Sequence, residues 1–328
     1  MSVAAHRQAA RRRAYVIMKP FCRSSPLTPF YILVNLTSYE KNHPLFAIAF
    51  LTLIALLAPA QASVTPDMTD FLRQQEQRLH ARIGMAVVNA QGETVFGYRQ
   101  DERFPLTSTF KTLACAALLE RLQKNGGSLD EQVTIPPDAL LDYAPVTKNY
   151  LAPATISLRM LCAAAVSYSD NTAGNRILTY LGGPDAVTQF MRGIGDPVTR
   201  LDRTEPTLNE ATPGDARDTS SPQKMAAGLQ KILTAPPLTP ANRAVLAQWM
   251  RDDKVGDALL RAALPKGWAI ADKTGAGGYG SRAIIAAVYP PERPPFYVAI
   301  FITQTEASMK MANETIAAIG KQLFAGQP

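Results

Sequence analysis

Histidine is scarce in this sequence, and its scarcity excludes much of the usual hydrolase chemistry. The 328 residues include only three histidines and three cysteines. One histidine, His80, lies beyond the apolar N-terminal region, and the pattern around it predicts an exposed helix position. A Ser-His-Asp triad needs a histidine base, and zinc sites of the usual kind need several histidine or cysteine ligands. We therefore predict no metal and no cofactor, and a reactive serine would need lysine or glutamate as its base.

The sequence also lacks an excess of positive charge outside its N-terminal region. The formal net charge is +7, from 34 basic and 27 acidic residues. Seven of the basic residues but only one of the acidic residues precede Ser63, so the rest of the chain carries +1. Nucleic-acid binding depends on a concentrated basic surface. We predict no nucleic-acid partner.

The N-terminal region contains an apolar run, residues 45–58, that is short for a membrane span. The run follows a short basic start at Lys41 and precedes Ala60-Gln61-Ala62, which fits the small-x-small rule for signal cleavage. A transmembrane anchor is the alternative interpretation. We predict that residues 1–62 are an N-terminal extension plus signal peptide, cut near Ala62, and that the mature chain is periplasmic without a stable membrane anchor.

Cys115 and Cys162 are the two cysteines of the predicted mature chain. In an exported protein such a pair is a plausible disulfide, and two buried free thiols are the alternative. A bridge would close a loop of about 48 residues and contribute roughly 4 kcal/mol in the chain-entropy model.

Strand patterns occur at both ends of the predicted mature chain, and helical patterns lie between them. Residues 67–82 predict a helix, and two strands follow around an Asn-Ala-Gln-Gly turn. Helical patterns with Pro- and Gly-rich joints run from Ser108 to about Asp252, and then three β-rich runs and a closing amphipathic helix follow. The simplest architecture is an α/β (α+β) fold, in which a five-stranded antiparallel sheet is built from both termini and flanked by helices.

This pattern also predicts a division of the chain into two lobes. Residues 63–105 and 253–328 would form an α/β lobe that contains the sheet. Residues 106–252 would form an inserted all-α lobe that carries Glu205 on a polar loop.

Four short motifs could together supply a serine hydrolase, and the first is Ser108 with Lys111. Residues three apart lie on one face of a helix. Ser108 opens the predicted helix, where backbone N–H groups and the helix dipole favour a developing oxyanion. Alone, the pair is more often an N-cap serine followed by a surface lysine.

The second and third motifs lie in the helical region. Ser169 offers a second hydroxyl for proton relay, and Asn171 offers an amide for a substrate carbonyl, although alone this stretch is a helix N-cap. Glu205 and Asn209 lie in a polar segment and could hold one water between them. Alone, they are part of a solvated loop.

The fourth motif ends a predicted strand. Lys273 and Thr274 can bind a carboxylate, and the small residues Gly275, Ala276 and Gly277 let a substrate lie beside the strand. Alone, this stretch is a strand that enters a turn.

In this order and spacing, the four motifs resemble those of class A β-lactamases and penicillin-binding proteins. The resemblance to class A β-lactamases covers residues 63–324, with a β-lactamase/transpeptidase-like fold. The segments ARIGMAV, RFPLTSTFKT, SDNTAGN, RLDRTEPTLNE, GDARDT and ADKTGAGGYGSR are similar to the carbenicillinase-type branch. That branch typically carries arginine where this chain has Lys273, so a general penicillinase is implied but efficient carbenicillin hydrolysis is not.

The resemblance implies roles in acylation. Ser108 would attack the lactam carbonyl, and its backbone N–H and that of Ala276 would bind the oxyanion. Either Lys111 or Glu205 acting through a water would be the acylation base. Ser169 would pass the proton to the leaving lactam nitrogen.

The resemblance also implies substrate-binding and deacylation roles. Lys273, Thr274 and Arg282 would hold the substrate carboxylate. Asn171 would bind the acylamide side chain, and Tyr143 would line the entrance. Glu205 and Asn209 would position the water that hydrolyses the acyl-enzyme.

Three structural features follow from the same resemblance. A cis peptide would precede Pro206, an Arg203–Asp218 ion pair would close the neck of the Glu205 loop, and Cys115 and Cys162 would form a disulfide. The implied ligands are penicillins, early cephalosporins and clavulanate-type inhibitors, and the implied state is a monomer.

Two other functions share most of these residues. A penicillin-binding DD-peptidase would use Ser108 and Lys111 but would not need Glu205 or Asn209. A non-hydrolytic β-lactam sensor would be acylated and remain so, which a substituted Glu205 would favour. Because Glu205 and Asn209 are both present, the β-lactamase is the predicted function.

Overall fold

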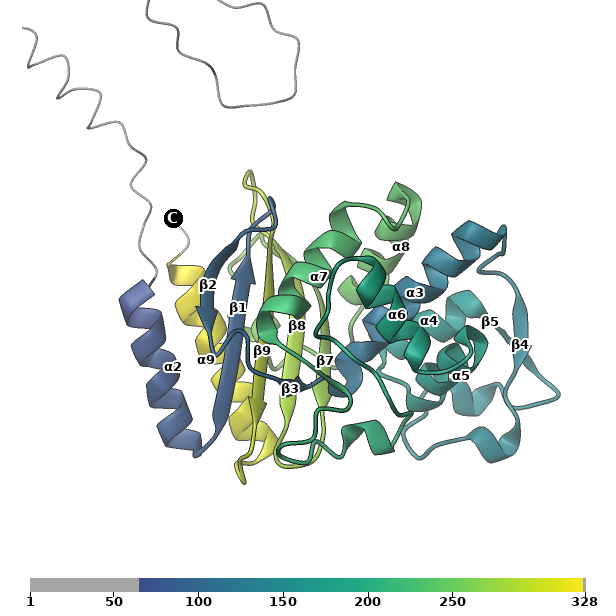
Figure 1. The fold of residues 1–328 in the computed structure, drawn as a ribbon, viewed down its shortest axis with the longest axis horizontal. Coiled ribbons are helices and arrows are strands. Elements are labelled where there is room, and N and C mark those ends of the chain that lie inside the picture. The colour runs from purple at the N-terminus through teal and green to yellow at the C-terminus, as the bar shows by residue number, and fades with distance from the viewer. Residues whose placement is uncertain (1–64, 327–328) are drawn as a thin grey trace, which may run out of the picture. The chain divides into compact units, whose positions relative to one another are not determined.

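Strands from both ends of the chain form one sheet in the computed structural model, which describes residues 65–326 (Figure 1). The sheet consists of β1 (Arg82–Val88), β2 (Thr94–Tyr98), β7 (Ala269–Ala276), β8 (Arg282–Tyr289) and β9 (Phe296–Thr303). Their order is β2-β1-β9-β8-β7, and every neighbouring pair is antiparallel. The predicted five-stranded antiparallel sheet is confirmed.

Helices cover both faces of this sheet. Helices α2 (Thr65–Leu79) and α9 (Met309–Ala325) pack on one face, and α7 (Pro222–Thr234) packs on the other (Figure 1). Alternate residues of β8 enter the two cores: Ile284, Ala286 and Val288 join the α2/α9 side, and Ala283, Ile285 and Ala287 join the α7 side. Burial on both faces explains why β8 is apolar throughout instead of alternating with polar residues.

The other helices lie on the α7 side of the sheet (Figure 1). They are α3 (Phe110–Asn125), α4 (Leu158–Ser167), α5 (Asn171–Leu181), α6 (Asp185–Gly193) and α8 (Pro240–Arg251). Helix α3 is central, because α4, α5, α6 and α8 all pack against it and its first ten residues are all buried. Ser108 precedes α3 by two residues and therefore lies at one end of a largely buried helix.

Short strands and 3-10 helices that the sequence pattern did not predict also occur, most of them in the helical region. The strands are β3 (Phe104–Pro105), β4 (Gln132–Thr134), β5 (Thr155–Ser157) and β6 (Thr219–Ser220), paired as β3–β6 and β4–β5. The 3-10 helices are η1 (Thr107–Thr109), η2 (Pro137–Ala139), η3 (Thr147–Asn149), η4 (Thr207–Asn209) and η5 (Leu260–Ala263). Segments of two to four residues are too short to show a hydrophobic period.

Several predictions about the chain's organisation stay predictions. The division into two lobes is one of them, and α7 packs on the sheet although it lies within residues 106–252. The predicted signal peptide and the cleavage site near Ala62 lie outside the described residues. Among residues 65–326, no helix combines the length and apolar character needed to cross a membrane.

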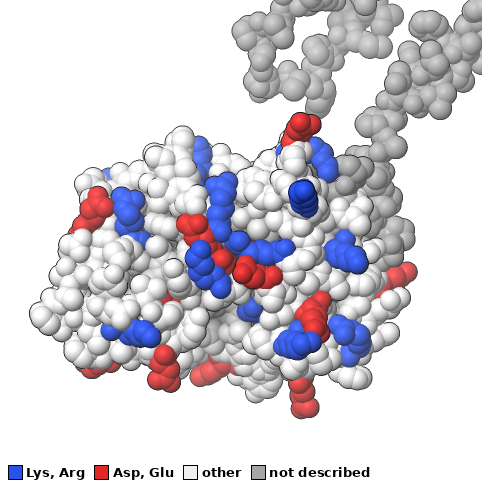
Figure 2. All heavy atoms as spheres, turned by 180° about the vertical axis from the view of Figure 1, so that it is seen from behind, with Lys and Arg blue, Asp and Glu red and all other residues white. Residues whose placement is uncertain are grey.

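Charge is mixed on the surface of the described residues. Figure 2 shows lysine and arginine side chains lying next to aspartate and glutamate side chains on the face seen from behind. Such mixing matches the near balance of charges after Ser63 in the sequence.

Gly84 in β1 allows Phe104 of β3 to pack closely against the sheet. A Cβ there would lie 2.4 Å from Cε2 of Phe104 and 2.8 Å from Cγ of Pro222, so the strand needs glycine at this point. The Phe104 ring also stacks on Phe301 with ring centroids 5.7 Å apart. Strand β3, which leads directly into Ser108, is thereby held against the sheet.

Cys115 of α3 and Cys162 of α4 form a disulfide with a Cα–Cα distance of 5.7 Å. This confirms the predicted pairing. The bridge joins two buried helices, and the cysteines are 47 residues apart in the sequence.

Replacing both Cys115 and Cys162 by alanine is expected to lower the free energy of unfolding by roughly 4 kcal/mol, because the unfolded chain regains the entropy of an open loop. Urea unfolding of the wild type and the variant measures this loss. As a control, dithiothreitol should lower the midpoint of the wild type and leave that of the variant unchanged. Equal stability of oxidised and reduced wild type would contradict the prediction.

Candidate active site

Ser108 lines a cavity of about 270 Å³ between the sheet and the helical region. Its other lining residues are Tyr143, Ser169, Asn171, Asn209, Val255, Thr274, Gly275, Ala276 and Arg282. Every one of these except Val255 was predicted from the sequence. A larger hollow of about 650 Å³ lies beside Arg78, Tyr279 and Glu306, and it contains none of the predicted residues. The smaller cavity is therefore the candidate active site.

The close approach of β7 to the start of α3 shapes this cavity. A Cβ on Gly275 would lie 2.0 Å from Oγ1 of Thr107 and 3.0 Å from the backbone nitrogen of Ser108. A Cβ on Gly277 would lie 2.7 Å from the carbonyl oxygen of Asn209. Only glycine allows backbones to come so close, so Gly275 brings the strand to the serine and Gly277 brings the following turn to the Glu205 loop.

The Lys111 side chain is the centre of the polar contacts. Its Nζ lies 2.9 Å from Oγ of Ser108 and 3.0 Å from Oε1 of Glu205. It also donates to the carbonyl oxygen of Ser169 at 2.8 Å and to Oδ1 of Asn171 at 2.6 Å. Burial lowers the pKa of Lys111, and the negative charge of Glu205 opposes that shift.

Glu205 is also within reach of the nucleophile. Its Oε1 lies 3.5 Å from Oγ of Ser108, and its side chain is fully buried. The Nδ2 group of Asn209 donates to Oε2 of Glu205, whereas Oδ1 of Asn209 is buried and accepts no hydrogen bond from the described residues. The peptide bond between Glu205 and Pro206 is cis, as predicted.

Asn175 holds the backbone of Glu205. The Glu205 N–H donates to Oδ1 of Asn175 at 2.8 Å, and Nδ2 of Asn175 donates to the Glu205 carbonyl at 2.9 Å. The sequence analysis missed this residue. A signal was present, because Asn175 lies four residues after Asn171 in α5 and so on the same helix face.

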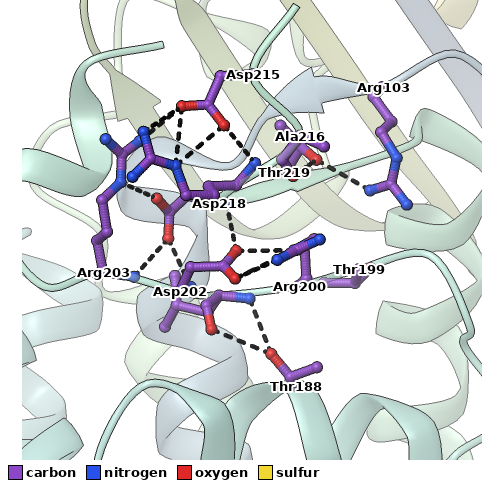
Figure 3. Close-up of polar contacts among 12 residues, drawn as sticks. Arg103, Thr188, Thr199, Arg200, Asp202, Arg203, Asp215, Ala216, Asp218 and Thr219 are labelled. Atoms are coloured by element: carbon purple, nitrogen blue, oxygen red, sulfur yellow. Dashed lines mark hydrogen bonds and ion pairs between the residues drawn. The ribbon is translucent and has the colours of Figure 1, made fainter. Parts of the chain in front are cut away.

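Polar contacts close the neck of the loop that carries Glu205. Arg203 donates from Nε to Oδ2 of Asp218 at 2.6 Å, which confirms the predicted ion pair. Figure 3 shows Asp218 between Arg203 and Asp202, and Asp202 in turn beside Arg200. The backbone N–H of Asp202 donates to Asp218, and that of Asp218 donates back to Asp202. The two ends of the loop are thus joined by side-chain and backbone contacts together.

Lys273 of β7 is fully buried and faces Ser169. Its Nζ lies 3.0 Å from Oγ of Ser169 and donates to the Thr274 carbonyl at 2.8 Å. Burial lowers the pKa of Lys273 to about 7, and the cations of Lys111 and Arg282 act in the same direction. The site therefore holds a lysine whose charge changes near neutral pH.

Arg282 begins β8 and is paired in register with Ala276. Its Nη1 donates to the Gly275 carbonyl at 3.0 Å, and its Nε donates to Oδ1 of Asn313 in α9 at 2.7 Å. Asn313 was not predicted, because it lies 31 residues away in the sequence and only the fold brings it to Arg282.

Asp170 is a buried residue of the Ser-Asp-Asn motif to which the sequence analysis gave no role. Its carboxylate caps α5 by accepting from Ala173, and it also accepts from the backbone and hydroxyl of Thr147. The Asn171 N–H donates to the carbonyl of Tyr143 at 2.9 Å. These contacts tie the segment that carries the half-exposed Tyr143 ring to α5.

The chemistry of this arrangement is that of acyl transfer. A serine, a buried lysine and a buried glutamate lie within hydrogen-bonding distance of one another. A second cation, Arg282, lines the same cavity, and a third, Lys273, contacts the Ser169 hydroxyl that lines it. Within residues 65–326, no group of three or more His, Cys, Asp and Glu side chains could hold a metal ion.

Comparisons with known proteins agree with this geometry. A family model described as "Beta-lactamase enzyme family" matches residues 65–326. The curated relative Beta-lactamase AER-1 of Aeromonas hydrophila is 50% identical over 262 residues, which cover 80% of this chain and 86% of the relative.

Solved structures give the same result. An ancestral class A β-lactamase is 44% identical with a TM-score of 0.76, covering 79% of this chain and 99% of that one. The chromosome-encoded β-lactamase of Vibrio parahaemolyticus is 42% identical with a TM-score of 0.76, covering 79% and 98%. Because the family model covers residues 65–326 and the curated relative is 50% identical over 80% of this chain, the chain belongs to the beta-lactamase enzyme family, and its structural neighbours identify it as a class A β-lactamase.

Proposed function

We propose that this enzyme hydrolyses penicillins and early cephalosporins through an acyl-enzyme on Ser108, which is released by a water that Glu205 activates. The observation that carries the proposal is the position of Glu205. Its carboxylate is held by Asn209 and lies 3.5 Å from Oγ of Ser108, where a general base can serve a reaction at that serine.

Acylation begins when Ser108 loses its proton and attacks the lactam carbonyl. Lys111 contacts both Ser108 and Glu205, so the proton can pass to either base. The backbone N–H groups of Ser108 and Ala276 bind the oxyanion. Ser169, which lies against Lys273, gives its proton to the lactam nitrogen as the ring opens, and the proton taken from Ser108 returns to Ser169.

Deacylation is the step that separates this enzyme from a penicillin-binding protein. Oδ1 of Asn209 is a buried acceptor that needs a donor. A water between Asn209 and Glu205 would supply that donor and lie close to the ester on Ser108. Glu205 takes a proton from this water as it attacks the ester carbonyl.

The substrate is held by its charge and its side-chain amide. Lys273, Thr274 and Arg282 bind the carboxylate common to penicillins and cephalosporins. Asn171 binds the acylamide, and Tyr143 borders the entrance of the cavity.

The cellular setting is proposed on the basis of the sequence. Cleavage near Ala62 would release a periplasmic monomer that meets β-lactam antibiotics before they reach their targets and so gives resistance. The presence of both Glu205 and Asn209 argues against a DD-peptidase or a non-hydrolytic sensor as the alternative.

The first experiment mixes the purified protein with benzylpenicillin and follows both product and intact protein mass. Hundreds of turnovers per enzyme are expected. Consumption of one equivalent with a lasting adduct on Ser108 would instead indicate a penicillin-binding protein or a sensor.

Changing Glu205 to glutamine is expected to lower kcat by about 10²–10⁴-fold, because glutamine cannot take a proton from the water. Intact mass spectrometry should show the acyl-enzyme accumulating during turnover. The matched control is Ser108→Ala, which should form no adduct. Normal turnover by Glu205→Gln would show that deacylation uses a different base.

Changing Lys273 to arginine is expected to alter the pH profile. Lys273 is a cation below its pKa of about 7 and neutral above it, so kcat/KM for benzylpenicillin should fall as the pH rises through 7. Arginine stays charged over this whole pH range, so kcat/KM of the variant should not fall as the pH rises through 7. A fall at the same pH in both proteins would assign it to another group, such as Lys111.

Preincubation with clavulanate is expected to reduce the rate of benzylpenicillin hydrolysis progressively, since Ser169 and Arg282 are both present. Arg282→Ala should require about tenfold more inhibitor, the value of one lost charged hydrogen bond. A rate that does not change after preincubation would contradict this prediction.

A further inference from the structure

Two buried carboxyl groups lie next to Lys273, outside the substrate cavity. Asp272 precedes Lys273 on β7, so its side chain points to the opposite face of the sheet. Asp253 lies in the segment between α8 and β7. Their exposed fractions are 0% for Asp272 and 4% for Asp253, so both carboxyl groups are removed from water.

Each carboxyl group has one oxygen with a partner and one without. Oδ1 of Asp272 accepts from Nε of Arg261 at 2.7 Å, and Oδ1 of Asp253 accepts from the Val255 N–H at 2.8 Å. No donor from the described residues reaches Oδ2 of either aspartate, although both atoms are buried. Two buried carboxylate oxygens without hydrogen-bond donors would lower the stability of the folded protein.

Gly256 shows that these two oxygens lie near one point. A Cβ on Gly256 would lie 2.5 Å from Oδ2 of Asp272 and 2.6 Å from Oδ2 of Asp253. Each oxygen is thus within about 2.6 Å of the same point beside Gly256. Ionised carboxylates only accept hydrogen bonds and repel one another, so a stable contact requires a hydrogen between them.

We propose that Asp253 and Asp272 share one proton between their Oδ2 atoms, and that this pair is a positioning unit that keeps Lys273 charged. The pair then carries one negative charge instead of two, and each Oδ2 has a hydrogen-bond partner. The second half of the proposal rests on the proposed function, in which the Lys273 cation binds the substrate carboxylate.

The charges around the pair favour this arrangement. Burial raises the pKa of Asp272 to about 7, the charge of Asp253 adds to the rise, and Arg261 of η5 opposes it. The other cations that interact with the pair are Lys273, with both carboxyl groups, and Arg282, with Asp253. Because the two carboxyl groups interact, the raised pKa describes the pair and not either residue alone.

The same groups decide the charge of Lys273. Lys111 and Arg282 repel its proton, whereas Asp253 and Asp272 attract it. The pair and Lys273 therefore titrate in the same pH range. When the pair releases its shared proton, it gains a second negative charge, which favours the Lys273 cation. Lys273 therefore stays charged to a higher pH than it would beside a pair that kept its proton.

Asp253→Asn is the sharpest test, because asparagine imitates a protonated aspartate. Its Oδ1 can still accept from Val255, its Nδ2 can donate to Asp272, and the total charge of the pair stays at one negative. Asp272→Asn is the reciprocal variant, with Oδ1 still accepting from Arg261. The matched control is Asp257→Asn, since Asp257 is exposed and close in the sequence.

The first measurement is the pH dependence of the unfolding equilibrium constant, obtained from urea titrations. In the wild type the folded pair keeps a proton that the unfolded aspartates lose near pH 4. Unfolding then releases one proton, so the unfolding constant should increase tenfold for each unit that the pH rises between 4 and about 7. Both asparagine variants should lose that one-proton slope, and Asp257→Asn should keep it. Equal slopes in all four proteins would overturn the shared proton.

The second measurement is kcat/KM for benzylpenicillin against pH. In Asp253→Asn the pair cannot gain its second charge, so the fall at high pH should begin about one unit lower than in the wild type. If the pair had only a structural role, the substitution would lower kcat/KM equally at every pH. That result would contradict the proposal that the pair keeps Lys273 charged. If the protein failed to hydrolyse penicillin at all, the proposed function would fail, whereas the unfolding slopes would still decide whether the proton is shared.

Discussion

The contact between the Lys111 ammonium and the Glu205 carboxylate, beneath Ser108, is the interaction on which the rest of the site depends. Both side chains are fully buried, and their charged atoms lie 3.0 Å apart. Removing one partner of a buried pair typically costs roughly 3–5 kcal/mol, because the other charge is left without compensation. The fold must therefore bring a loop residue and a helix residue together and hold them there.

Many of the surrounding features serve that requirement. Lys111 lies in the first turn of α3, a helix that four other helices contact and whose first ten residues are all buried. Glu205 lies on a loop that has little regular structure, so its position depends on polar contacts: Asn175 and Asn209 beside it, and the Arg203–Asp218 neck behind it. The loop is thus held by hydrogen bonds where the helix is held by packing.

Much of the fold could be predicted from the sequence, because the sheet strands are β-rich runs bounded by turn residues and the terminal helices have apolar residues at helical spacing. The site residues could be named because four motifs occur in a recognisable order. The remaining residues could not be found this way. Asn313 and Val255 contribute single contacts from segments without a motif, and Asp253 joins Asp272 only after the chain has folded. Asn175 could have been inferred from the sequence, because it lies on the same helix face as Asn171.

The sheet built from both ends of the chain has a consequence for the order in which the protein can fold. Strand β1 lies between β2 and β9, and Arg82 is paired with Thr303, so the central strand pairing joins residues separated by most of the chain. Proteins dominated by such distant contacts fold slowly. Because the whole helical region separates β1 from β9 in the sequence, β1 cannot complete its pairing until that region and β9 have been synthesised. An incomplete chain would therefore expose the β9-facing edge of β1, and an unpaired strand edge of this kind can pair with strands of other molecules.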